Sequence, residues 1–280
     1  MRTRRKRLSL RRILLMAILA LLLFIVLFPY TWAILTSFKP DQQIRIGEPL
    51  FWPEPFTLAH YDKLLRGTLF LTWFKNSMIV AAISGLVGVV IGAPAAYGLA
   101  RFRFRGRSVM STAVLVTYTV PTTLLFIPFM VMMNDLRLIN TLTSAVITYA
   151  TITAPFCTWI MLGFFRSIPV ELGESALIDG CGRLGAFLRI ELPLSQSGLI
   201  AVAIFSFNLA WMEYIYAFTL LTSDSQKTLP IGISTLQVGD VFPWGVLMAA
   251  VVLTSLPIAV LFFLLQRYFV AGLTAGAVKG

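Results

Sequence analysis

Charged residues are scarce in this chain of 280 residues. Asp and Glu together number only 12, and all charged residues make up 12% of the sequence. Soluble domains carry about 25% charged residues. Apolar residues instead reach 58%, and the mean hydropathy is +0.84. This composition argues against a soluble globular protein.

Reactive side chains are equally scarce. The chain has one histidine, His60, and two cysteines, Cys157 and Cys181. The chain therefore has too few histidines and cysteines for a metal cluster or for a Cys-His or Ser-His nucleophile system. No G-x-x-x-x-G-K-[ST] phosphate-binding motif occurs. We expect no enzymatic activity and no directly bound metal or cofactor, so any uphill transport must draw its energy from an ion gradient or from another subunit.

Long uncharged stretches dominate what is present. About 20 apolar residues are needed to cross a bilayer as a helix. Six such runs occur, and the fifth alone contains a charge, Glu213: residues 13–36, 77–100, 110–133, 141–165, 197–221 and 244–266. They predict an all-α polytopic membrane protein with a six-helix transmembrane domain over 13–266, a basic tail at 1–12, a loop at 166–196 and a C-terminal tail at 267–280.

The basic residues indicate the orientation. Sixteen of the 23 Lys and Arg residues lie in four alternate segments, seven in 1–12, four in 101–109, three in 166–196 and two in 267–280. By the positive-inside rule, these segments and both termini are cytoplasmic. The formal charge of +11 then orients the chain in the lipid bilayer, and no nucleic-acid partner is needed to explain it.

The loop at 166–196 is too long for a simple turn. Pro169 favours the start of a short helix, and Gly180 and Gly182 favour a turn after it. An apolar stripe lies beside acidic residues on this helix, namely Val170, Leu177, Cys181 and Leu184 beside Glu171, Glu174 and Asp179. Either the helix docks on a partner, or it lies along the membrane surface as an amphipathic cap.

This loop resembles a known signature. Glu174-Ser175-Ala176, three residues, Gly180, nine residues and Ile190-Glu191-Leu192-Pro193 are similar to the E-A-A-x3-G-x9-I-x-L-P pattern of ABC importer permeases. Ser175 and Cys181 depart from the usual small residues. Asn76-Ser77, residues 95–104 and residues 266–280 extend the resemblance to maltose-type carbohydrate permeases, which have the type I importer fold. It implies ATPase coupling at Glu174, Ser175, Ala176, Asp179, Gly180, Ile190 and Pro193.

The resemblance also implies partners. In that family the loop is a coupling helix that inserts into an ATPase subunit, and the ATPase dimer holds ATP and Mg²⁺. A second, homologous permease subunit and an extracytoplasmic solute-binding protein complete the importer. The location implied is the bacterial inner (plasma) membrane. Which sugar or polyol is carried cannot be read from this chain, because selectivity belongs largely to the binding protein.

Glu213 is the second distinctive feature, because an ionisable residue inside a span is a functional candidate by default. We place a candidate substrate pathway at Asn208, Trp211, Glu213, Tyr216, Thr119 and Thr122. Two other interpretations stay open. Glu213 can be a structural polar anchor between helices, or the chain can be a proton-coupled secondary transporter that relays protons through Glu213 and works without an ATPase.

Overall fold

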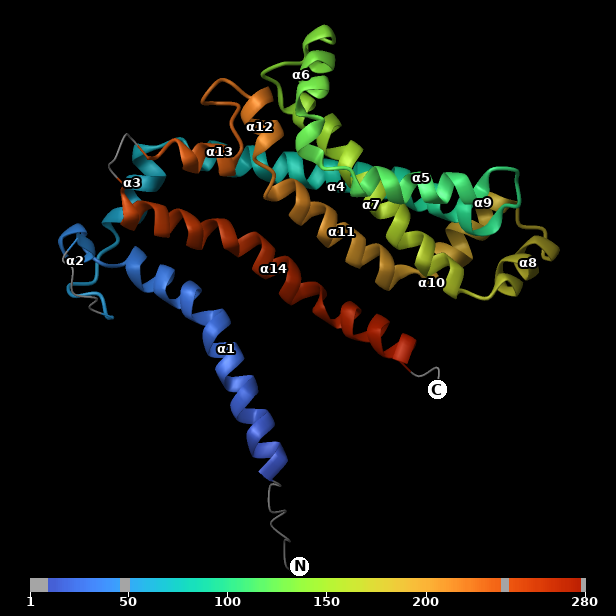
Figure 1. Cartoon of the computed structure of the whole chain (residues 1–280), viewed down its shortest axis with the longest axis horizontal. Coiled ribbons are helices and arrows are strands. Elements are labelled where there is room, and N and C mark those ends of the chain that lie inside the picture. Colours follow the sequence, from blue (N-terminus) through green and yellow to red (C-terminus); the bar gives the residue numbers. More distant parts are fainter. Residues whose placement is uncertain (1–9, 46–50, 238–241, 278–280) are drawn as a thin grey trace, which may run out of the picture. The chain divides into compact units, whose positions relative to one another are not determined.

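The computed structural model describes residues 10–45, 51–237 and 242–277, with side chains as far as Gln266. These residues form helices and connecting segments without a strand (Figure 1). The chain divides into two compact units. One comprises Met1–Thr68 with Leu236–Ser255, and the other comprises Leu69–Thr235 with Leu256–Gly280.

The first unit contains α1 (Leu10–Ser37), α2 (Asp41–Arg45), α3 (Ala59–Gly67) and the start of α14 (Trp244–Ala277). His60 is buried here, and its Nε2 lies 2.7 Å from the carbonyl oxygen of Lys39. A Cβ at Gly245 would come within 2.1 Å of that nitrogen. The lone histidine is therefore a packed structural residue. Lys39 is also buried, which lowers the pKa of its amine, and its Nζ lies 4.2 Å from the Trp32 ring centroid.

The second unit is built around α4 (Phe70–Arg101), α7 (Leu142–Ser167) and α11 (Gln196–Trp211), which pack side by side (Figure 1). Gly88 and Gly92 allow the close approach of α4 to α7. A Cβ at Gly88 would lie 2.5 Å from Oγ1 of Thr153, and one at Gly92 would lie 2.7 Å from Cβ of Cys157. Small residues spaced four apart are a common device for packing helices tightly in membranes.

Shorter elements connect these helices. They are α5 (Arg107–Thr119), η1 (Thr122–Leu124), α6 (Phe126–Asp135), α8 (Val170–Ile178), α9 (Arg183–Ala186), η2 (Phe187–Glu191), α10 (Leu192–Leu194), α12 (Ile215–Leu220) and α13 (Leu229–Ser234). The last helix, α14, continues through most of the predicted C-terminal tail to Ala277.

The structure does not confirm six continuous spanning helices. Among the described residues, four helices are long and apolar enough to span a membrane: α1, α4, α7 and Trp244–Gln266 of α14. A fifth candidate is the pair Arg183–Leu194 and Gln196–Trp211, which is bent by 79°. The run expected at 110–133 is divided around Pro121 into α5, η1 and α6. The run at 197–221 is divided between Trp211 and Ile215.

At the end of the unit opposite α8, side chains of α4 hold the segment between α12 and α13. Asn76 donates from Nδ2 to the carbonyl oxygens of Ser225 and Lys227, both at 2.9 Å. Ser77 accepts at Oγ from the backbone N–H of Leu229 at 2.7 Å. Asn76 and Ser77, which are part of the family resemblance, thus fix the segment between α12 and α13 to α4 by hydrogen bonds.

Candidate functional site

Helix α8 forms in the loop where the sequence predicts a short helix. It begins at Val170, directly after Pro169, and its end is closed by Gly180 with φ of +85°. The Gly180 N–H donates to the Leu177 carbonyl at 3.2 Å, and the Cys181 N–H donates to the Ala176 carbonyl at 3.0 Å. This pair of bonds is the Schellman motif, which needs a left-handed residue after the helix. Gly180 therefore ends α8 and reverses the chain.

The surface of α8 combines exposed apolar and acidic side chains. Ile178 is 86% exposed, and Val170 and Leu177 are exposed as well; Leu184, further along in α9, is also exposed. Glu171, Glu174 and Asp179 are exposed, and within the described part of the chain none of them forms an ion pair. Ala176 and Gly173 are buried on the opposite side. We call this exposed set the α8 surface.

The second half of the signature lies in η2 and α10. Ile190 is half-buried and Pro193 is exposed, whereas Glu191 between them is 1% exposed. Arg101, the last residue of α4, donates from Nε to Oε1 of Glu191 at 2.6 Å and from Nη2 to Oε2 at 2.8 Å. The same Nη2 donates to the Ile168 carbonyl at 2.9 Å. One guanidinium therefore ties both ends of the loop to α4.

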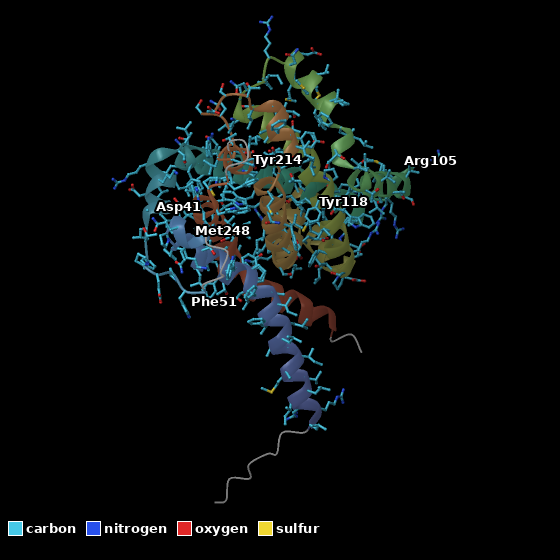
Figure 2. All side chains as sticks on the ribbon, turned by 60° about the vertical axis from the view of Figure 1, so that its left-hand side comes forward. Asp41, Phe51, Arg105, Tyr118, Tyr214 and Met248 are labelled. Atoms are coloured by element: carbon cyan, nitrogen blue, oxygen red, sulfur yellow. The ribbon has the colours of Figure 1, made fainter. Side chains whose placement is uncertain are left out.

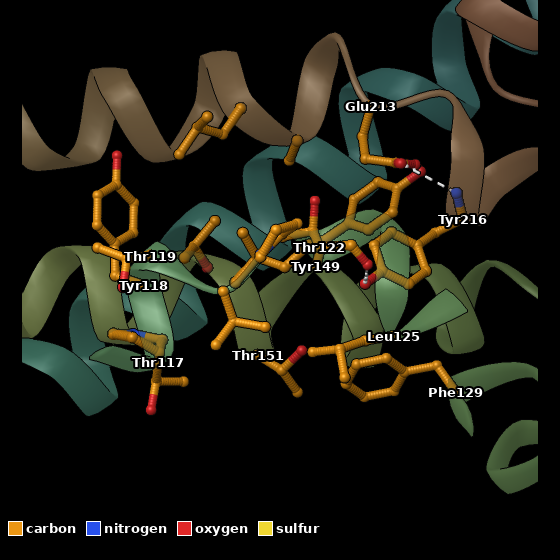
Figure 3. Close-up of a pocket in the computed structure, with 17 residues that line it drawn as sticks. Thr117, Tyr118, Thr119, Thr122, Leu125, Phe129, Tyr149, Thr151, Glu213 and Tyr216 are labelled. Atoms are coloured by element: carbon orange, nitrogen blue, oxygen red, sulfur yellow. Dashed lines mark hydrogen bonds between the residues drawn. The ribbon is translucent and has the colours of Figure 1, made fainter. Parts of the chain in front are cut away.

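A cavity of about 540 Å³ lies between helices of the second unit (Figure 3). It is contained by the end of α5, η1, α6, α7, the end of α11 and α12. Its lining residues are Thr117, Tyr118, Thr119, Val120, Pro121, Thr122, Leu125, Phe129, Tyr149, Thr151, Ile152, Thr153, Pro155, Leu209, Ala210, Glu213 and Tyr216. Hydroxyl and aromatic groups are concentrated in this list. Four of the six predicted pathway residues, Thr119, Thr122, Glu213 and Tyr216, are among them.

Glu213 lies in the break between α11 and α12. Its Oε1 accepts from the Tyr216 N–H at 2.9 Å, and its Oε2 accepts from the Ala217 N–H at 3.1 Å (Figure 3). The carboxylate thus satisfies the first free donors of α12, where the helix dipole favours negative charge. This geometry supports the structural-anchor interpretation, and the same carboxylate also lines the cavity.

Two tyrosines frame this carboxylate. Tyr149 from α7 is 1% exposed and interacts electrostatically with Glu213. Its hydroxyl makes no hydrogen bond of ordinary geometry to the side chains and backbone that are described. The Tyr216 hydroxyl donates to the Thr122 carbonyl at 2.6 Å, which links α12 to the η1 turn. The cavity therefore contains a buried phenol next to a carboxylate.

The other two predicted pathway residues lie elsewhere. Trp211 is 1% exposed, with its ring 5.5 Å from Phe207 in a stacked arrangement and 5.5 Å from Phe74 edge-on. It is thus part of the packed interior. Asn208 is half-buried and is not among the cavity residues. The structure brings neither of them to Glu213's cavity.

Sequence reasoning missed three residues of these sites. Glu191 occupies the unspecified position of the signature, and Arg101 follows the predicted span 77–100 as one of several basic residues, so neither stood out. Tyr149 belongs to the same hydroxyl-rich stretch of α7 as Thr151 and Thr153. No helical spacing in the sequence distinguishes Tyr149 from the other polar residues of that stretch.

These features define an α-helical membrane protein with a cavity between its helices, lined by apolar and hydroxyl side chains, and an exposed loop helix at one end. Residues 88–275 match the family described as "Binding-protein-dependent transport system inner membrane component". The chain belongs to this family. That assignment gives no support to the proton-coupled alternative.

Individual relatives agree with the family. The inner membrane ABC transporter permease protein YcjP of Escherichia coli K12 is 36% identical over 264 residues, covering 94% of each chain. The trehalose/maltose transport system permease protein MalG of Thermococcus litoralis is 36% identical over 274 residues, covering 97% of this chain and 98% of the relative. A chain of the crystal structure of a bacterial ABC transporter for alginate import has the same fold, with a TM-score of 0.80 and 22% identity, over 96% of this chain and 99% of that chain.

Proposed function

We propose that this chain forms half of the translocation pathway of an ATP-driven carbohydrate importer. Its family is defined by dependence on a binding protein, and a relative 36% identical is named as a trehalose/maltose permease. The sequence has no nucleotide-binding motif, so ATP and Mg²⁺ belong to a partner ATPase dimer. A second, homologous permease and an extracytoplasmic solute-binding protein complete the assembly.

The observation that carries the proposal is the α8 surface. Exposed apolar side chains lie next to acidic groups that form no ion pair with any described residue, on a helix closed by Gly180. Such a surface suits insertion into a basic-rimmed groove of the ATPase. The signature residues Glu174, Ser175, Ala176, Asp179 and Gly180 all belong to this short segment. Docking there would let the ATPase move α8 as a unit when its halves close on ATP.

Arg101 and Glu191 would carry that motion onward. The pair is buried and bidentate, and it joins η2 directly to the end of α4, one of the long apolar helices. Arg183 of α9 adds a second contact, since its guanidinium lies 5.0 Å from the Phe102 ring centroid just after α4. A displacement of α8 would therefore be transmitted to α4 through these side-chain contacts.

The cavity beside Glu213 suits passage of a hydroxylated solute. Threonine hydroxyls can donate and accept, and the rings of Tyr118, Phe129 and Tyr216 offer flat apolar faces. Sugars present both kinds of surface. On the orientation indicated by the basic segments, both termini and α8 face the cytoplasm.

Substitution of Ile178 tests the docking. We expect Ile178→Gln to weaken association with the ATPase by about tenfold or more, because burying a large aliphatic side chain contributes about 1.5–3 kcal/mol. Co-purification of the ATPase with tagged permease is the measurement. Leu136→Gln is the matched control, since Leu136 is 55% exposed and follows α6, at the other end of the second unit from α8.

The two variants separate docking from general damage. Leu136→Gln should retain the ATPase, and both variants should insert into the membrane at normal levels. Normal ATPase recovery and normal transport with Ile178→Gln would refute the assignment of α8 as the docking element.

A further inference from the structure

A second cavity, of about 380 Å³, lies between α5 and α7 and is separate from the one beside Glu213. It is lined by Arg107, Ser108, Ser111, Thr112, Leu115, Trp159 and Arg166. Its lining contains two guanidinium groups, three hydroxyls and no carboxylate. Such a set of donors suits an anion with several acceptor oxygens.

The α5 residues of the cavity share one helix face. Arg107, Ser108, Ser111, Thr112 and Leu115 follow the spacing i, i+1, i+4, i+5 and i+8, which keeps them on one side of the helix. Arg107 is the first residue of α5, so the helix dipole adds positive potential at the same end. Leu115 lies two turns further along. The cavity is thus charged at one end and apolar at the other.

The Arg107 side chain is held in position. Its Nε donates to the Leu99 carbonyl at 2.6 Å, and its Nη2 donates to the Ala100 carbonyl at 3.0 Å. Nη1 has no partner among the described residues. Arg166 lies opposite, on α7, and it makes no hydrogen bond or ion pair within the described part of the chain. Two guanidinium groups thus have N–H donors to offer at a site without a counter-charge.

Ser111 provides the independent indication of a ligand. The residue is 8% exposed, and its Oγ has no hydrogen-bond partner within the described residues. An unsatisfied buried hydroxyl costs about 1–3 kcal/mol, and an acceptor oxygen in the cavity would remove that cost. Ser111 is one of the residues that line the cavity, one turn along α5 from Arg107.

The position of the cavity identifies the source of the anion. Arg166 is the second-last residue of α7, a helix long and apolar enough to span the membrane, so the charged end lies at the membrane boundary. Trp159 lies two turns deeper, where an amphipathic ring suits the interface. Val109, Met110 and Val116, on other sides of α5, are exposed apolar side chains as well. A phosphate group with acyl chains matches this arrangement, in which the arginines come first, then the hydroxyls of α5, then apolar side chains.

We propose that this cavity binds the phosphate group of an anionic phospholipid. Arg166 and Nη1 of Arg107 would bind the phosphate oxygens, Ser111 would donate its hydroxyl, and the acyl chains would lie along Leu115 and the exposed side of α5. On the proposed orientation the site faces the cytoplasmic leaflet, where basic pockets between helices bind lipid headgroups. The lipid would brace α5 against α7 beside the loop that carries α8.

Lipid titration of the purified full-length protein, stripped of native lipid in detergent, tests the site. Binding is followed by native mass spectrometry and by the midpoint of thermal unfolding. The probes are phosphatidylglycerol, phosphatidylcholine and inorganic phosphate. We expect phosphatidylglycerol to bind and to raise the midpoint, and the other two to have little effect at the same concentration.

Substitutions at arginines distinguish the site from general charge attraction. Arg166→Gln removes an exposed side chain and should weaken phosphatidylglycerol binding by about tenfold, the value of one charge-assisted hydrogen bond. Arg105→Gln is the matched control, since Arg105 belongs to the same end of the unit but lies at its edge and does not line the cavity (Figure 2). It should bind phosphatidylglycerol normally.

Each other outcome overturns the assignment. An equal effect from phosphatidylcholine would mean that the acyl chains alone are recognised. Binding of inorganic phosphate as tight as that of the lipid would make the site one for the free anion. Equal losses with Arg105→Gln and Arg166→Gln would show unspecific attraction to the basic end of the protein.

Discussion

Gly173 of α8 leaves the space that Glu191 of η2 occupies. A Cβ at position 173 would lie 2.9 Å from Oε1 of Glu191, closer than real Cβ contacts allow. The carboxylate cannot simply move away, because Arg101 holds both of its oxygens. The α8 helix, the η2 segment and the end of α4 thus meet at one buried ion pair.

Breaking this pair should uncouple the loop from α4. Glu191→Gln leaves the Arg101 guanidinium largely buried without its counter-charge, and Arg101→Met leaves the Glu191 carboxylate in the same state. Removing one partner of a buried pair costs about 3–5 kcal/mol. We expect both single variants to lower the thermal unfolding midpoint and to abolish transport.

The double variant Arg101→Met with Glu191→Leu separates stability from coupling. Apolar replacements of similar size often restore stability at a buried pair. We expect the unfolding midpoint to recover while the number of ATP molecules hydrolysed per solute rises, because the bidentate link to α4 is lost. A double variant with the wild-type ratio of ATP to solute would assign the pair a purely structural role.

We expect any side chain at Gly180 to be unfavourable because of the backbone conformation there, and not because of crowding. Nothing lies within 4 Å of a Cβ built there, but its φ of +85° is left-handed, which costs an L-residue about 1–2 kcal/mol. Gly180→Ala should therefore unwind the end of α8 and reduce stimulation of the partner ATPase by solute. Gly182→Ala is the control, because Gly182 has equal space and an ordinary φ of −69°. If both variants stimulate ATPase activity normally, the closed end of α8 has no part in coupling.

The sequence near α8 predicted this helix correctly, because single residues determine where it begins and ends. Pro169 precedes its first turn, and Gly180 supplies the left-handed conformation that ends it, as expected from sequence. The pairing of Arg101 with Glu191 could not be predicted in this way. The two residues are 90 positions apart, and a charged residue in a loop normally faces solvent.

The breaks at Pro121 and Glu213 were hidden for a different reason. Proline by itself does not predict a break, since Pro29, Pro94, Pro155 and Pro257 all lie inside continuous helices of this protein. Hydropathy does not reveal a break either, because both runs stay largely apolar on each side of it. Long runs therefore predicted membrane segments at 110–133 and 197–221. The breaks within them are accompanied by hydrogen bonds of particular residues: Glu213 accepts from the N–H groups of Tyr216 and Ala217, and the Tyr216 hydroxyl donates to the Thr122 carbonyl.

Glu213 should prove necessary for α12 in a way that its charge alone does not explain. Glu213→Ala removes both acceptors that satisfy the N–H groups of Tyr216 and Ala217, and loss of a helix cap costs about 0.5–2 kcal/mol. Glu213→Gln keeps one carbonyl acceptor. We expect a clearly lower unfolding midpoint for the alanine variant and a small change for glutamine. Equal destabilisation by both would show that the negative charge, and not the cap, stabilises this region.

Packing between α4 and α7 gives the sharpest test of the second unit. Gly92→Ala places a methyl group 2.7 Å from Cβ and 2.8 Å from Sγ of Cys157, inside the buried seam. Overpacking of this kind typically costs about 1–3 kcal/mol, so the unfolding midpoint in detergent should fall. Gly163→Ala on α7 is the control, because nothing lies within 4 Å of its Cβ and alanine favours a helix. Cys157→Gly combined with Gly92→Ala removes the two nearest atoms, leaving the Ala154 carbonyl oxygen at 3.0 Å, and should restore part of the lost stability. No rescue would mean that α4 and α7 do not meet at these two residues.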